Sequence, residues 1–148
     1  MIKLLLKTDI INKSRLLKIM TVAIIMGLII MVYHPVFHHE FVNYDDPLYI
    51  SLSSRSLSSN NICWAFTTLD FANWHPLTWL SLMLDYKLYT GNPGGYHLTN
   101  LLFHLVATFL LLFLCKKMTG SFYHSAFVAA LFALHPLHVE SVAWVSER

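Results

Sequence analysis

Two short clusters of polar side chains have the residue types needed for acid–base chemistry or for binding a cation. The first is the adjacent pair Asp45 and Asp46 in the stretch FVNYDDPLYI, and the second is the stretch HPLHVE, which carries His138 and Glu140. A carboxylate can act as a general base toward a hydroxyl group, and carboxylates also bind divalent cations. Both clusters lie beside a long apolar run, so such chemistry would take place at a membrane surface.

The aspartate pair has a structural interpretation as well as a functional one. Asp46 precedes Pro47, a pattern that predicts Asp46 as the N-cap of a helix with proline at its first position. Asp45 has no such explanation. Because neighbouring carboxylates repel each other, the pair is tolerated more easily in water than near a membrane pocket. We therefore interpret Asp46 as a cap and Asp45 as the candidate for chemistry.

In the second cluster, Pro136 is expected to kink or end a helix and to free backbone groups, which favours a cavity-lining position. His135, His138 and Glu140 could bind zinc, but their spacing around the proline does not support a ligand geometry, and we assign no metal site. A hydrogen-bonded, water-facing cluster is the functional interpretation. The structural interpretation is that these are polar residues at a helix end whose hydrogen bonds are satisfied. His75, between Trp74 and Pro76, could approach a phosphate or lie at the membrane interface.

The composition identifies the solvent of this chain as a lipid bilayer. Of its 148 residues, 56% are hydrophobic and 12% are charged, whereas soluble domains carry about 25% charged residues. The hydrophobic residues form long runs, which is typical of membrane spans. The net charge of +2 does not indicate a nucleic-acid partner.

Three segments could cross the membrane, at about residues 16–33, 97–115 and 125–144. A cleaved signal peptide competes with the first, but no small-residue cleavage site follows it. Basic residues precede the first segment and follow the second, so the positive-inside rule places the N-terminus in the cytoplasm and residues 34–95 outside it. The basic residues are Lys3, Lys7, Lys13, Arg15, Lys116 and Lys117.

The outer segment has two parts of different character. Residues 51–61 are polar and rich in serine, which predicts a mobile loop that could include short helical turns. Residues 74–90 are apolar and aromatic but too short to span, so we expect a helix that begins near Pro76 and lies in the outer interface. The stretch TGNPGG, residues 90–95, should end that helix.

The second span carries polar residues on one face. His97, Asn100, His104 and Thr108 recur at helical spacing, and unpaired polar groups are costly in hydrocarbon. The stripe should therefore face protein or water, either as a hydrogen-bonding seam between helices or as part of a ligand cavity. Three helices offer little interior for it. We expect an all-α membrane protein in which residues 1–148 form a single partial membrane domain of a larger bundle.

The blocks FVNYDDPLYI, NWHPLTWLSLMLDYKLYTGNPGGYHLTNLLFHLVATFLLLFL and ALFALHPLHVESVAWVSER resemble the N-terminal membrane part of GT-C glycosyltransferases. They are most similar to the transmembrane, TPR-containing protein O-mannosyltransferases and their bacterial relatives, over about residues 37–148. The resemblance implies a partial GT-C fold of about three transmembrane helices with interfacial helices in the outer loop. It also implies a multi-pass enzyme that moves a sugar from a polyprenyl-phosphate donor to an acceptor outside the cytoplasm.

The resemblance also implies roles for individual residues. Asp45 would be the general base of an inverting displacement, and Asp46 would support it or a divalent cation. Glu140 would be a second acidic site residue. His75 and His138 would contact the lipid phosphate.

The chain departs from that family in its small number of spans, and it ends at VSER, within a block that continues in relatives. We therefore expect it to be inactive alone and to need missing C-terminal helices or a partner membrane subunit. The alternative is a small non-catalytic membrane scaffold or assembly subunit whose polar helix face binds partner helices. A fragment of a pore or transporter is a third interpretation.

Overall fold

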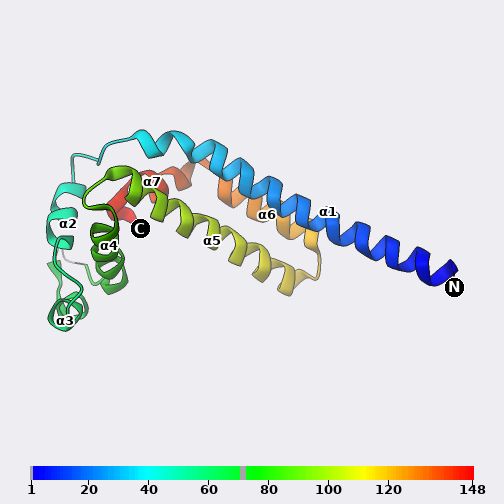
Figure 1. Ribbon diagram of the computed structural model, residues 1–148, viewed down its shortest axis with the longest axis horizontal. Coiled ribbons are helices and arrows are strands. Elements are labelled where there is room, and N and C mark those ends of the chain that lie inside the picture. The colour runs from blue at the N-terminus through cyan, green and yellow to red at the C-terminus, as the bar shows by residue number, and fades with distance from the viewer. Residues whose placement is uncertain (1, 71–72) are drawn as a thin grey trace. The chain divides into compact units, whose positions relative to one another are not determined.

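The protein is represented by a computed structural model that describes residues 2–70 and 73–148, and all the regular secondary structure in those residues is helical (Figure 1). The predicted all-α membrane fold is confirmed. The helices are α1 (Ile2–Tyr33), η1 (His34–His38), α2 (Asp46–Ser53), α3 (Ser59–Thr67), α4 (Pro76–Tyr89), α5 (Pro93–Thr119), α6 (Phe122–Leu134), η3 (Pro136–His138), α7 (Val139–Ala143) and η4 (Val145–Glu147).

Two helical stretches in the described residues, Asn12–His38 and Pro93–Thr119, are each long and apolar enough to cross a membrane. A third candidate is the pair Phe122–Leu134 and Pro136–Ala143, which bends by 57° at its break. α6 ends at Leu134, as the proline at position 136 predicts. These stretches coincide with the three segments predicted from the sequence.

The chain divides into two compact units. Unit 1 comprises the residues up to Val32 together with Leu105–Pro136, and unit 2 comprises Tyr33–His104 together with Leu137–Arg148. The sequence-based assignment of residues 1–148 to one partial domain stays a prediction.

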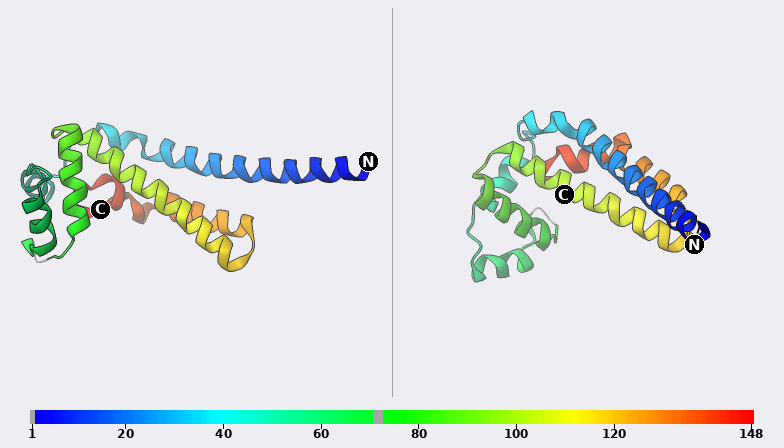
Figure 2. Two further views of the ribbon diagram at one scale, coloured as in Figure 1. Left: turned by 60° about the horizontal axis from the view of Figure 1, so that its bottom comes forward. Right: turned by 45° about the vertical axis from the view of Figure 1, so that its right-hand side comes forward.

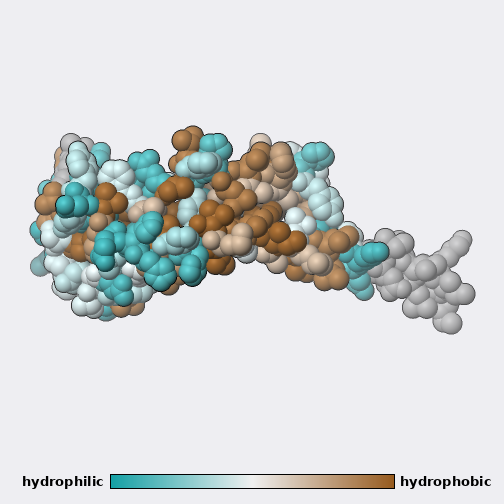
Figure 3. Space-filling model, turned by 90° about the horizontal axis from the view of Figure 1, so that it is seen from above, coloured by the Kyte–Doolittle hydropathy of each residue, from teal (hydrophilic) through white to brown (hydrophobic). Residues whose placement is uncertain are grey.

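Unit 1 exposes apolar side chains and buries small ones. Met31 and Phe127 are 67% and 63% exposed, and Figure 3 shows hydrophobic residues as a brown band over the region of α1. On α6, Ala126, Ala129 and Ala133 are buried and recur on one helical face. Small residues let helix backbones approach closely, and an apolar outer surface of this extent needs lipid around it.

Unit 2 has an aromatic core. In it α4 packs against α2 and α3 (Figure 2). The helix predicted to lie in the outer interface therefore buries part of its surface in protein, with Trp79 0% exposed and Leu77 74% exposed. The buried residues of this core are Tyr49, Ala65, Trp79, Leu82, Tyr96 and Val145.

The ends of the helices in unit 2 follow their local sequences. α4 begins at Pro76, as predicted, and ends where Thr90 (φ 50°) and Gly91 (φ 80°) take left-handed conformations. The segment 51–61, predicted as a loop with short helical turns, contains the end of α2 at Ser53 and the start of α3 at Ser59. Serine also caps the second of these helices: the Ser58 hydroxyl accepts a hydrogen bond from the Asn61 amide at 3.4 Å.

Candidate functional site

The aspartate pair begins α2, one residue out of the register predicted for it. α2 starts at Asp46, and Asp45 is its N-cap. The Asp45 carbonyl accepts a hydrogen bond from the Tyr49 amide at 3.1 Å. The prediction of Asp46 as N-cap is therefore wrong by one residue. Proline fits anywhere in a first helical turn, where amides need no intrahelical partner, so Pro47 does not distinguish the two registers.

Asp46 has a structural role of a different kind. Its side chain is fully buried, and its carboxylate accepts hydrogen bonds from the amides of Val42 and Ser146, each at 2.9 Å. Two charge-assisted bonds from backbone amides satisfy this buried charge and tie the start of α2 to the start of η4. Asp45 is half-buried, and its side chain makes no capping hydrogen bond in the part of the chain described. Asp45 therefore has the more accessible carboxylate.

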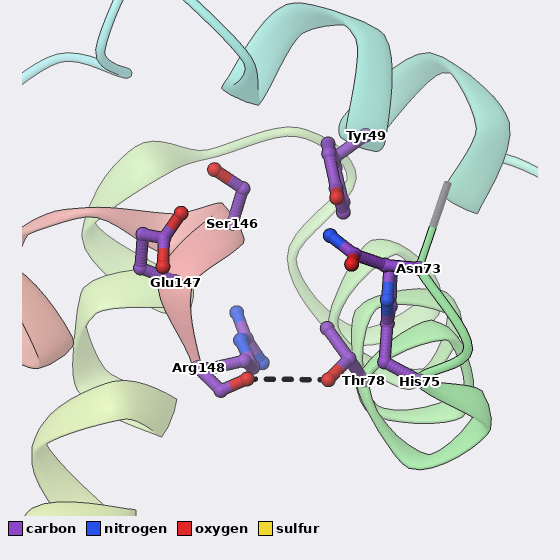
Figure 4. A pocket seen from close by; sticks show the side chains of 7 residues that line it. All are labelled: Tyr49, Asn73, His75, Thr78, Ser146, Glu147 and Arg148. Atoms are coloured by element: carbon purple, nitrogen blue, oxygen red, sulfur yellow. Dashed lines mark hydrogen bonds between the residues drawn. The ribbon is translucent and has the colours of Figure 1, made fainter. Parts of the chain in front are cut away.

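A polar pocket of about 180 Å³ lies in unit 2 next to this pair. Figure 4 shows side chains from α2 and from the start of α4 on one side, facing those of residues 146–148 on the other. Of the predicted site residues, His75 lines the pocket, whereas Asp45, Glu140 and His138 do not. The lining residues are Tyr49, Asn73, His75, Thr78, Ser146, Glu147 and Arg148.

The charge of Asp45 acts on Tyr49, a residue of the pocket wall. Burial raises the pKa of Tyr49 above its ordinary value, and the negative charges of Asp45 and Glu147 raise it further. Asp45 precedes Tyr49 by one helical turn, and its carbonyl accepts the hydrogen bond from the Tyr49 amide. Asp45 is therefore linked through α2 to a residue of the pocket wall, although it does not line the pocket.

His75 is held in the pocket wall by aromatic stacking. Its ring lies 5.7 Å from the ring of Tyr49 and 5.2 Å from that of Trp79, in stacked geometry. Burial lowers the pKa of His75, which favours the neutral imidazole. Its Nε2 atom is buried and has no hydrogen-bond partner among the described residues. A neutral imidazole can offer a ligand one hydrogen bond from this position.

Arg148 forms the opposite wall and is almost completely buried. Its side chain is 3% exposed and pairs with Asp85, which is 2% exposed. Burial lowers the pKa of the guanidinium, and the neighbouring Asp85 opposes that change. The Nε atom donates to the Val145 carbonyl at 3.3 Å, whereas Nη2 is buried without a partner in the residues described. One donor is thus unused on a cationic side chain that lines the pocket.

The Asp85–Arg148 pair was not found from the sequence. Asp85 is the only acidic residue in the apolar stretch SLMLDYKLY, and a lone carboxylate in such a helix is a signal for a buried partner. The Thr99 hydroxyl also donates to Asp85 Oδ1, at 2.7 Å. The cationic partner lies 63 residues further along the chain, and no local pattern indicates that distance.

The predicted site residues of the second cluster, His138 and Glu140, lie in unit 2 but outside the lining of this pocket. His138 is the N-cap of α7, and its ring lies 5.9 Å from the ring of His104. Glu140 is exposed in the first turn of α7. Within the described residues no group of three His, Cys, Asp or Glu side chains could hold a metal ion. Asp46 already uses both carboxylate oxygens on backbone amides, so we derive no step through the divalent cation that the resemblance suggested.

The polar stripe of α5 is buried, as predicted. His97, Asn100, His104 and Thr108 are 0%, 1%, 6% and 0% exposed. The Asn100 amide donates to the carbonyls of Val142 and Trp144, at 3.3 and 3.2 Å. Asn100 therefore binds backbone acceptors at the end of α7, which is the hydrogen-bonding seam that the stripe predicted.

The comparisons with known proteins find relatives of one kind. The chain is 35% identical over 118 residues to the protein O-mannosyl-transferase F38B6.6 of Caenorhabditis elegans, which covers 75% of this chain and 16% of that protein. It is 38% identical over 95 residues to protein O-mannosyl-transferase Tmtc2 of Drosophila melanogaster, covering 62% and 10%. It is 38% identical over 76 residues to human protein O-mannosyl-transferase TMTC3, covering 51% and 8%.

No protein-family model and no solved structure matches the chain. The chain spans at most 16% of the length of the relatives described above. The chain is a homologue of the protein O-mannosyl-transferases, which are GT-C type glycosyltransferases, and the resemblance predicted from its sequence is confirmed.

Proposed function

We propose that this chain contributes the outer catalytic surface of a membrane glycosyltransferase that moves a sugar from a polyprenyl-phosphate donor to a hydroxyl group of a protein. The names of the relatives support the transfer to protein. In the proposed topology the N-terminus is cytoplasmic and residues 34–95 are outside, which puts α2, α4 and the pocket on the outer face.

The observation that carries the proposal is the pair of unused polar atoms at the pocket of unit 2. Arg148 Nη2 and His75 Nε2 are both buried without a partner among the described residues, and both residues line the cavity. A phosphate oxygen would accept hydrogen bonds from both, and bonds to an ionised group are the stronger kind. Glu147 also lines the cavity, but it is exposed, and solvent screens its repulsion of an anion.

The proposed chemistry uses Asp45 as the general base. Its carboxylate would take the proton of the acceptor hydroxyl while the acceptor oxygen forms a bond to the sugar C1 atom. The bond from C1 to the phosphate oxygen breaks, and the polyprenyl phosphate leaves with that electron pair. Arg148 and His75 would stabilise the charge on the departing phosphate. Asp46 would hold the base in place by anchoring the start of α2.

Two further predicted roles belong to this proposal. Glu140 would be a second acidic residue on the outer face, and His138 would contact the phosphate. The relatives are several times longer than the matched segment. Further helices, on the same polypeptide or on a partner subunit, would complete the donor site, and the residues of this chain would be inactive without them.

The decisive variant is Asp45→Asn, introduced at the native locus so that the polypeptide is tested as the cell makes it. Loss of a general base should reduce sugar transfer in isolated membranes by about 10²–10⁴-fold, with membrane insertion unchanged. Asp70→Asn is the matched control, because Asp70 is exposed in the same unit, and it should retain activity. Transfer at the wild-type rate in Asp45→Asn would remove Asp45 from the mechanism.

The scaffold alternative depends on a polar helix face that is open to partner helices. All four residues of that face are buried, and Asn100 already binds carbonyls of this chain. This observation favours the enzyme over the scaffold.

A further inference from the structure

Unit 1 contains a groove that the proposed glycosyltransferase site does not use. It has a volume of about 470 Å³, and its walls come from α1, α5 and α6. Every residue that lines it belongs to unit 1, so the groove is separate from the polar pocket of unit 2. Its lining includes the apolar residues Val22, Leu112, Phe113 and Phe122 and the cations Lys18 and Lys116.

The two lysines bring positive charge to the lining of the groove. Lys18 is half-buried, and its ammonium lies 5.9 Å from the centre of the Phe122 ring, a cation–π contact that holds the charge at the groove. Lys116 is exposed on α5. Among residues 12–70 and 73–148, neither lysine forms an ion pair with a carboxylate. The apolar cavity therefore has two cations in its lining that no carboxylate of those residues neutralises.

We propose that this groove binds an anionic phospholipid, with an acyl chain along the apolar walls and the phosphate between Lys18 and Lys116. Charge complementarity selects this occupant. Basic pockets between membrane helices bind anionic lipid head groups, and lysine stems lie along apolar surface while the ammonium reaches the head-group region. A zwitterionic lipid has no net charge, so it would leave the positive charge of Lys18 and Lys116 uncompensated.

An apolar helix from another subunit fits the groove less well. It would remove the two lysines from water without providing a carboxylate, and burying unpaired charge is costly. A phospholipid provides both parts of the required chemistry, because its chain is apolar and its phosphate is negative at the depth where the cations lie.

The test is native mass spectrometry of the 148-residue chain with phosphatidylglycerol as the probe and phosphatidylcholine as the comparison. The wild-type chain should bind phosphatidylglycerol preferentially. Lys18→Gln combined with Lys116→Gln should weaken its binding by roughly 25-fold, because each lysine near an anionic head group contributes on the order of fivefold. Equal binding of the two lipids to the wild-type chain would overturn the proposal.

Two further variants separate a built site from general attraction to a basic surface. Lys13→Gln combined with Lys117→Gln removes the same charge from neighbouring positions of α1 and α5 that lie outside the groove lining, and it should have little effect. An equal loss in both double variants would contradict a specific site. Ala23→Phe keeps both lysines but fills the groove, and wild-type lipid binding in that variant, with helicity unchanged by circular dichroism, would also overturn the proposal.

Discussion

The two units differ in where they place charged side chains. Unit 2 buries charged side chains, Asp46, Asp85 and Arg148, and satisfies them with backbone amides or with each other. Unit 1 exposes large apolar side chains, such as Met31 at 67% and Phe127 at 63%. The difference is one of charge: unit 2 contains buried charged side chains that are paired, whereas residues 12–32 and 105–136 of unit 1 contain no buried charged side chain.

A single helix, α5, shows the change along its length. Within unit 2 it buries His97, Asn100 and His104. Within unit 1 it exposes Phe109 and Phe113, at 50% and 57%. The same helix therefore contacts polar protein near its start and presents an apolar surface for lipid nearer its end.

The contrast between the units requires that the buried charges of unit 2 contribute to its stability. The variant Asp85→Asn tests this requirement and has the largest expected effect. Removing one partner of a buried ion pair leaves Arg148 buried without a counter-charge, which should lower the free energy of unfolding by about 3–5 kcal/mol. Denaturant unfolding of the purified chain measures the change. Asp70→Asn, at an exposed site, should change it by less than about 0.5 kcal/mol.

A second variant shows whether the effect comes from the unpaired charge or from lost packing. Asp85→Leu combined with Arg148→Met removes both charges and keeps apolar volume, so it should recover much of the stability lost in Asp85→Asn. Equal destabilisation in the single and double variants would mean that the pair contributes through shape and not through charge.

A smaller effect is expected in the pH dependence of stability, to which the buried His75 of unit 2 contributes. Burial lowers the pKa of His75 from 6.5, so the unfolded chain binds this proton more tightly than the folded one. Its contribution to stability is therefore complete above pH 6.5 and is lost as the pH falls from there through the lowered pKa. Unfolding midpoints at about pH 7.5 and about pH 5.5 should differ more in the wild type than in His75→Gln. An identical pH dependence in the two proteins would exclude a buried, neutral His75.

Sequence reasoning identified the features that depend on local patterns. The spans, the start of α4 at Pro76 and the buried stripe with Asn100 follow from hydropathy, proline chemistry and helical periodicity. The N-cap of α2 was predicted one residue too late, at Asp46 in place of Asp45, because a proline tolerates either register in a first turn.

The contacts that build the walls of the pocket were not predicted from the sequence, for a different reason. Arg148 and Asp85 meet across 63 residues, and Asp46 and Ser146 meet across 100. Pairs at such separations are set by tertiary packing, for which the local sequence contains no signal. His75 was identified because it lies between an aromatic residue and a proline at a helix start, where its position depends on neighbours in sequence.

The most direct test of the proposed site is photocrosslinking of the chain in lipid nanodiscs with a polyprenyl-phosphate mannose that carries a photoreactive group beside the phosphate. The proposed geometry predicts label on the pocket of unit 2, at residues 73–78 and 146–148, and loss of that label with excess unmodified donor. Label confined to the groove lined by Lys18 and Lys116 would contradict it, because the donor phosphate would then bind in unit 1 and not beside Asp45.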